Sequence, residues 1–284
     1  MQRTNLHGFS VSGLFLASLL TAVCAYAQRP GAPYPPTPLT PKVKPTGVVF
    51  QAADALGMVR GLGEDVFDAV NRIEFKIEGV AYAPAHGAWK EIKISSATMQ
   101  ISYHQAASRL IIDSALADGT KVHAIEVVDG RYAWNEQTPG VGGVPAMQTV
   151  ATRARDIWLT PQGFIYQVEQ AGPQRVKIGK HDGKTTLSVV IDGEPVTATL
   201  GADHRPELIE AKISDRELGR TTLSIEYSGY KDFDYYGIFF PSHVIAKLGG
   251  HTALDVTVSS FLTHTYFLFP KPDSIAQLVA KADK

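Results

Sequence analysis

Asp-Gly dipeptides recur between runs of alternating apolar and polar residues, and this combination most constrains the fold. Asp129-Gly130, Asp182-Gly183 and Asp192-Gly193 each separate two such runs. An Asp-Gly pair is typical of a two-residue β-hairpin turn, because aspartate tolerates the positive φ that the turn needs and glycine adopts it freely. The sequence therefore predicts an antiparallel meander with one wet face.

Period-two alternation predicts about a dozen strands along the chain. They are expected at residues 73–79, 89–94, 99–103, 110–114, 122–128, 131–134, 175–179, 185–191, 196–200, 208–213, 221–227, 238–248 and 254–260. A sheet of this size curls or closes on itself. The predicted fold is mainly β, a large curved antiparallel sheet or unclosed barrel with an N-terminal helix and a mid-chain helical insertion.

The stretch 223–244 joins two of these strands through a polar, aromatic turn. Pro241 cannot donate a backbone hydrogen bond, so its strand is expected at a sheet edge or at a bulge. Tyr235 and Tyr236 in the turn are candidates for the rim of a ligand site. The alternation predicts five residues that face inward: Leu223, Ile225, Tyr227, Ile238 and Phe240.

Helical spacing appears in two regions. Residues 51–70 read either as one amphipathic helix interrupted by glycines or as two short helices with a turn, and both interpretations stay open. Residues 149–159 predict a second helix, and Thr160-Pro161 has the residue types of an N-cap and first position for a third helix over 162–170.

The N-terminus has the pattern of an export signal. Arg3 precedes an apolar run at 11–23, which is too short to span a bilayer comfortably and ends in Ala25-Tyr26-Ala27. We expect cleavage after Ala27, no stable membrane span in the mature chain, and a periplasmic or secreted location. Lipidation at Cys24 is the less favoured alternative, because the preceding residue in such motifs is normally small.

The predicted organisation is a signal peptide at 1–27, a proline-rich linker at 28–46, a β domain at 47–264 and a tail at 265–284. The linker has too few large apolar side chains to pack. Because Cys24 is the only cysteine, a cleaved chain has no thiol for disulfides, catalysis or metal binding.

Charge and motifs point away from several functions. The net charge is −1, which offers no basic field for nucleic acid. The nine histidines show no metal-binding spacing, and no nucleophile or phosphate motif is present. The segment 232–237 resembles the start of a calcium loop, but Tyr236 occupies a ligand position and the closing glutamate is missing. We expect no enzyme activity, no cofactor and no metal.

The remaining feature of the sequence is its set of large aromatic side chains. Most large side chains are expected to fill the core, whereas some line a cavity for a fatty ligand if one exists. The cavity candidates are Trp134, Trp158, Phe164, Tyr166, Tyr235, Tyr236 and Phe240.

Two motifs in this order of elements carry a family resemblance. They are W-L-T-P-x-G-F at Trp158 to Phe164 and Y-x-D-F-D-x-x-G-x-x-F-P at Tyr230 to Pro241. With them, residues 51–264 resemble the LolA/LolB-like superfamily of periplasmic lipoprotein-sorting carriers. The resemblance implies an unclosed β-barrel covered by helices, an apolar cavity, and an acyl chain or lipoprotein as partner.

The segment 223–258 is also similar to exported bacterial proteins in which such a region precedes a metallo-β-lactamase-type domain. The H-x-H-x-D-H motif of that domain is absent from this sequence. The resemblance therefore implies no hydrolase activity here.

Two functions follow from these observations. The first is a non-enzymatic lipid or lipoprotein carrier with an apolar cavity, and the alternative is a non-catalytic accessory or interaction domain with a filled core. A hydrolase built from dispersed residues such as His181, His204 and His243 is a weaker third hypothesis. A continuous apolar cavity favours the carrier, and a solid core favours the accessory domain.

Overall fold

The computed structural model describes residues 47–59, 70–85, 87–263 and 265–282. The predicted signal peptide and linker at 1–46 lie outside the described residues, as does most of the second half of the glycine-interrupted helix at 60–69.

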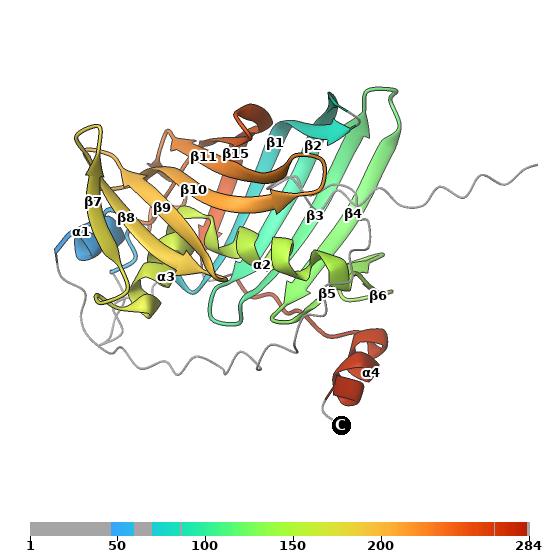
Figure 1. Ribbon diagram of the computed structural model, residues 1–284. Coiled ribbons are helices and arrows are strands. Elements are labelled where there is room, and N and C mark those ends of the chain that lie inside the picture. Colours follow the sequence, from blue (N-terminus) through green and yellow to red (C-terminus); the bar gives the residue numbers. More distant parts are fainter. Residues whose placement is uncertain (1–46, 60–69, 86, 264, 283–284) are drawn as a thin grey trace, which may run out of the picture.

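One large sheet dominates the described part of the chain (Figure 1). It has 13 strands in the order β6-β5-β4-β3-β2-β1-β15-β14-β11-β10-β9-β8-β7, and every pairing is antiparallel. Because β6 and β7 do not pair, the sheet stays open, which confirms the predicted fold class. The strands are β1 (Arg72–Ala85), β2 (Ala88–Ser102), β3 (Ala107–Leu116), β4 (Lys121–Asp129), β5 (Tyr132–Glu136), β6 (Val144–Pro145), β7 (Lys177–His181), β8 (Lys184–Ile191), β9 (Glu194–Leu200), β10 (Pro206–Asp215), β11 (Gly219–Ser228), β14 (His243–Leu248) and β15 (His251–Thr263).

Helices lie on the side toward which the sheet curves, called here the inner face (Figure 1). They are α1 (Gly47–Ala55), α2 (Val150–Trp158), which follows the short 3-10 helix η2 (Met147–Thr149), and α3 (Pro161–Ala171). Helix α4 (Asp273–Ala282) lies apart from them, next to β6. Among the described residues, no helix is long and apolar enough to cross a bilayer.

The predicted hairpin turns are present. In the turns that join β7 to β8 and β8 to β9, Asp182, Gly183, Asp192 and Gly193 have φ between 48° and 84°. At the β4–β5 turn the position is shifted by one residue, because Asp129 still pairs with Tyr132 and Gly130 takes the left-handed conformation.

The prediction for Pro241 is wrong about where its strand lies. The expected strand at 238–248 is two strands: β13 (Phe239–Phe240) pairs with β12 (Lys231–Asp232), whereas β14 lies in the main sheet between β11 and β15. Pro241 falls in the break between them. The missing N–H therefore breaks the strand instead of placing it at an edge.

The strands predicted separately at 89–94 and 99–103 are also one continuous strand, β2. Its register shifts where it passes β1 and β3, which explains why the alternation is interrupted near residues 95–96.

The inner face carries the main apolar core. The five residues expected to face inward from 223–244 are all buried there, which confirms the alternation. On the opposite, outer face of β3, β4 and β5, the C-terminal segment forms a second and smaller apolar cluster.

Candidate functional site

Three aromatic rings stack on the inner face where α2 and α3 meet the sheet. The ring of Tyr103, just after β2, is 6.2 Å from that of Trp158 and 6.0 Å from that of Tyr166, and the last two rings are also 6.0 Å apart. All three side chains are buried. Such pairs contribute roughly 1 kcal/mol each beyond the area they bury, so the stack holds both helices against the strands.

Thr160 connects this stack to the start of α3. Its hydroxyl accepts from the backbone N–H of Gly163 (3.1 Å), donates to the carbonyl of Ile157 (3.0 Å) and lies 2.8 Å from the Tyr103 hydroxyl. The predicted N-cap at Thr160-Pro161 is thus confirmed. Burial raises the pKa of Tyr103 far above its usual value, so the phenol stays neutral.

Phenylalanines fill the neighbouring part of the inner face. The ring of Phe240 is 4.9 Å from that of Phe75 and 4.4 Å from that of Phe261, and Phe164 of α3 is fully buried in the same core. The structure therefore brings four predicted cavity residues into one packed region: Trp158, Phe164, Tyr166 and Phe240.

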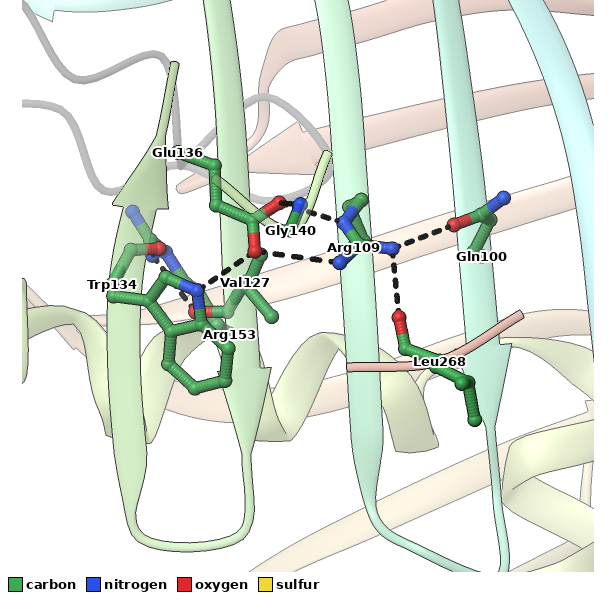
Figure 2. Close-up of polar contacts among 8 residues, drawn as sticks. All are labelled: Gln100, Arg109, Val127, Trp134, Glu136, Gly140, Arg153 and Leu268. Carbon is green, nitrogen blue, oxygen red and sulfur yellow. Dashed lines mark hydrogen bonds and ion pairs between the residues drawn. The ribbon is translucent and has the colours of Figure 1, made fainter. Parts of the chain in front are cut away.

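A buried arginine anchors α2 to the strands. Arg153 donates from Nη1 to the carbonyl oxygens of Val127 (3.0 Å) and Trp134 (2.9 Å), and from Nη2 to Oδ1 of Asn135 (2.6 Å). Its guanidinium is also 3.6 Å from the buried carboxylate of Glu126. Figure 2 shows this side chain behind β4 and β5, on the side away from the outer cluster.

Asp156, one helical turn further along α2, is a buried carboxyl group. Burial raises its pKa from 3.8 to about 7, and the Arg155 guanidinium 3.5 Å away opposes that shift. The hydroxyl of Tyr227 donates to the carbonyl of Leu159, just after α2, and burial raises the pKa of Tyr227 as well. Helix α2 is thus held by a few buried polar contacts as well as by ring packing.

Trp134 does not join the inner-face group. Its ring is fully buried in the outer cluster, and its Nε1 donates to Oε1 of Glu136 at 2.9 Å. Glu136 also accepts from the backbone N–H of Gly140 (2.9 Å) and forms a two-pronged ion pair with Arg109, with N–O distances of 3.0 and 3.3 Å (Figure 2).

Arg109 connects this cluster to the C-terminal segment. Its Nη1 donates to the carbonyl of Leu268 at 3.0 Å (Figure 2). Its guanidinium also lies 5.3 Å from the ring centre of Phe269. The tail residues Phe267, Phe269 and Ile275 pack here against Ala107, Val127 and Trp134. The tail therefore covers an ion pair and part of the outer face.

Tyr235 and Tyr236 lie away from both clusters. Their side chains are 92% and 71% exposed, in the turn between β12 and β13. Tyr235 has φ of 64°, an uncommon conformation for a residue with a side chain. The base of the turn is fixed, because Asp232 Oδ2 accepts from the N–H of Gly237 at 2.7 Å.

A hollow of about 450 Å³ with several charged lining residues lies near the start of β10. Asp203, Arg205, Glu207 and Tyr230 are among its lining residues, and Arg205 stacks 4.1 Å from the ring centre of Phe239. Asp203 pairs with Arg205 and Glu207 pairs with Lys184. A hollow with this charged lining does not suit an acyl chain.

Several residues of these arrangements were not predicted. The sequence offers no signal for Tyr103, Arg153, Asp156 or the Arg109–Glu136 pair. The first three acquire their contacts or burial when α2 and α3 pack on the sheet, and the last pair meets when β3 and β5 both flank β4. The three histidines of the hydrolase hypothesis lie on β7, in the β9–β10 turn and on β14. Within the described ranges, no group of three or more metal-ligating side chains occurs.

Comparison with known proteins finds a likeness to solved structures alone. No family model matches the sequence, and no curated protein is significantly similar to it. Among solved structures, the chain is similar to a LolA superfamily protein from Nitrosomonas europaea. The match has 13% identity and a TM-score of 0.36, and it covers 79% of this chain and 96% of that chain. At this identity and TM-score it says nothing about the ligand or activity of this chain.

Proposed function

We propose that this protein is an exported, non-enzymatic carrier that binds the acyl chain of a lipid or lipoprotein on the inner face of its sheet. The observation that supports it is an open 13-stranded sheet whose apolar inner face is covered, in the described part of the chain, by helices and the short β12–β13 hairpin. A helical cover can move as a unit without breaking strand pairing, so such a face can be exposed to a ligand.

In the conformation described here, the rings of α2 and α3 occupy the inner face. An acyl chain must therefore displace Trp158, Phe164 and Tyr166 from their contacts. Each buried methylene of the chain is worth about 0.8 kcal/mol, so a chain of ordinary length supplies on the order of 10 kcal/mol toward that displacement.

The packing itself favours the alternative, a non-catalytic accessory domain with a filled core. Three sets of contacts hold α2 and α3 against the sheet, as expected for a permanently closed interior: the aromatic stack, the Thr160 hydrogen bonds and the Arg153 hydrogen bonds. The two functions differ in whether the helices ever leave the sheet.

Lipid analysis of the gently purified protein distinguishes them. A carrier is expected to show bound lipid by native mass spectrometry, and its ligand should displace a fluorescent fatty acid. Tyr227→Phe removes one hydrogen bond that holds the end of α2, worth roughly 1 kcal/mol, and is expected to bind the probe a few-fold more tightly. Val190→Ser on the exposed outer face is the matched control. Bare polypeptide and no probe binding in any variant would support the accessory domain.

Export is part of the proposal. The apolar run at 11–23 and the Ala25-Tyr26-Ala27 signal support it. The intact mass of the protein recovered from a Gram-negative periplasm should correspond to a chain that begins at Gln28 and carries no lipid. A mass that retains residues 1–27 would contradict export by this signal, and a lipidated Cys24 would support the alternative.

A further inference from the structure

The strand β7 forms one open end of the main sheet. Among the described residues it pairs with β8 alone, and all five of its residues are exposed. The unpaired edge of a strand is a template for another strand, because its N–H and C=O groups point outward in a row.

The register of the β7–β8 hairpin identifies which backbone groups face outward. His181 and Lys184 flank the two-residue turn and so form a hydrogen-bonded pair. Alternation makes Gly179 with Thr186 and Lys177 with Ser188 hydrogen-bonded pairs as well. The N–H and C=O groups of Ile178 and Lys180 therefore point away from β8, toward the open edge.

The side chains of this edge set the character of a partner. Arg175, Lys177 and Lys180 are exposed and have no ion-pair partner in the described part of the chain. Ile178, 61% exposed, lies opposite the buried Leu187 and extends the inner apolar face to the edge. A partner strand thus gains from acidic residues together with one apolar side chain that covers Ile178.

We propose that the outer edge of β7 binds an extended, acidic segment of a partner protein by β-strand addition. The backbone groups of Ile178 and Lys180 supply the main-chain hydrogen bonds, and Lys177, Lys180 and Arg175 select for negative charge. A second copy of this chain fits poorly, because two antiparallel β7 strands would set Lys177 of each copy against His181 of the other.

The competing interpretation is that the lysines only prevent edge-to-edge association, as they do on many edge strands. A labelled peptide of alternating glutamate and valine, about eight residues long, tests the proposal by fluorescence anisotropy with the purified protein at low salt. A lysine-valine peptide of the same length is the control. The acidic peptide is expected to bind and the basic one is not.

Two variants of Lys180 distinguish the contribution of its side-chain charge to peptide binding from that of its backbone N–H. Lys180→Ala loses the charge but keeps the N–H, whereas Lys180→Pro also removes the outward N–H and leaves the pairing with β8 intact. Lys180→Pro is expected to bind the acidic peptide at least about tenfold more weakly than Lys180→Ala. In the wild type, the bound peptide should slow hydrogen exchange at the amides of Ile178 and Lys180.

The outcomes that overturn the proposal are equally specific. Equal binding by Lys180→Pro and Lys180→Ala, or protection at another strand, would place the peptide elsewhere. No binding by the wild type, together with self-association of Lys177→Ala/Lys180→Ala in analytical ultracentrifugation, would show that the lysines only guard the edge. Circular dichroism of each variant checks that it is folded.

Discussion

Buried charged side chains form hydrogen bonds with β5 on both of its faces. On the inner side, Arg153 donates to the carbonyl of Trp134, and on the outer side the indole of the same residue donates to Glu136 (Figure 2). One short strand near the open β6 end of the sheet thereby contacts both α2 and the C-terminal tail. The β5 residues that contact α2 and those that contact the cluster under the tail are therefore neighbours along the chain: Trp134 and Glu136.

Removing Arg109 should be strongly destabilising. Arg109→Met leaves the buried Glu136 carboxylate with only its donors from Trp134 and Gly140, and breaking a buried ion pair on one side typically costs about 3–5 kcal/mol. We expect this loss of stability to appear as a lower urea midpoint of unfolding. Arg109→Met combined with Glu136→Leu should cost less than the sum of the two single changes, and strict additivity would contradict the coupling.

Asp156 should make stability depend on pH between about 4 and 7. The folded-state pKa of about 7 lies above the ordinary value of 3.8, so in this range the folded protein holds a proton that the unfolded chain has lost. Its stabilising contribution is full below the unfolded pKa and is lost as pH rises through the folded one, by up to about 1.4 kcal/mol per pH unit.

Asp156→Asn should remove this slope and be more stable than the wild type near pH 8. Urea unfolding across the pH range measures both effects. Glu91→Gln makes the same carboxyl-to-amide change on the exposed side of β2 and should keep the wild-type slope. An unchanged slope in Asp156→Asn would show that other groups produce it.

At the scale of elements, short sequence motifs predicted the features that adjacent residues determine, namely turns and a helix cap. The Asp-Gly turns and the Thr160-Pro161 cap are set by residues adjacent in sequence. The cap and the turns at 182–183 and 192–193 are present as expected, and the turn at Asp129-Gly130 is shifted by one residue. The prediction made from Pro241 was wrong because a missing N–H indicates only that this residue donates no hydrogen bond to a neighbouring strand. Whether a strand then lies at an edge or stops and restarts depends on contacts with distant residues, such as the bonds that the N–H of Ser242 donates to the carbonyls of Ser228 and Gly229.

The Thr160 cap offers a test at this scale. Thr160→Ala removes the acceptor for the N–H of Gly163 and the partner of the Tyr103 hydroxyl, so a loss of about 1–2 kcal/mol is expected. Thr160→Ser keeps the hydroxyl and should lose little. Thermal unfolding compares them, and an equal loss in both variants would assign the effect to the threonine methyl group.

At the scale of the whole molecule, the sequence predicted the curved open sheet better than it predicted the site. Four of the seven candidate residues lie in the inner-face core because alternation and helical spacing place them there. Alternation along β5 places Trp134 on the outer face, and its ring is buried there because the tail, distant in sequence, covers it. No short-range pattern records such a contact, and the same holds for the Arg153 anchor, which joins α2 to two strands that precede it.

The position of Trp158 allows the proposed ligand face to be tested directly. A fatty acid brominated near the end of its chain quenches only indole rings that it contacts. If the acyl chain binds between α2 and the sheet, it must reach Trp158, whereas Trp134 is buried on the outer face under the tail. Saturable quenching is therefore expected in the wild type and should be largely lost in Trp158→Phe, a change that keeps an aromatic ring in the stack. The unbrominated acid controls for conformational effects on fluorescence. The third tryptophan, Trp89, also packs against the main core, so the decisive variant is Trp158→Phe/Trp89→Phe, in which Trp134 is the tryptophan that remains. Quenching that persists in this variant would place the lipid away from the inner face and leave the accessory-domain function as the better account of the closed core.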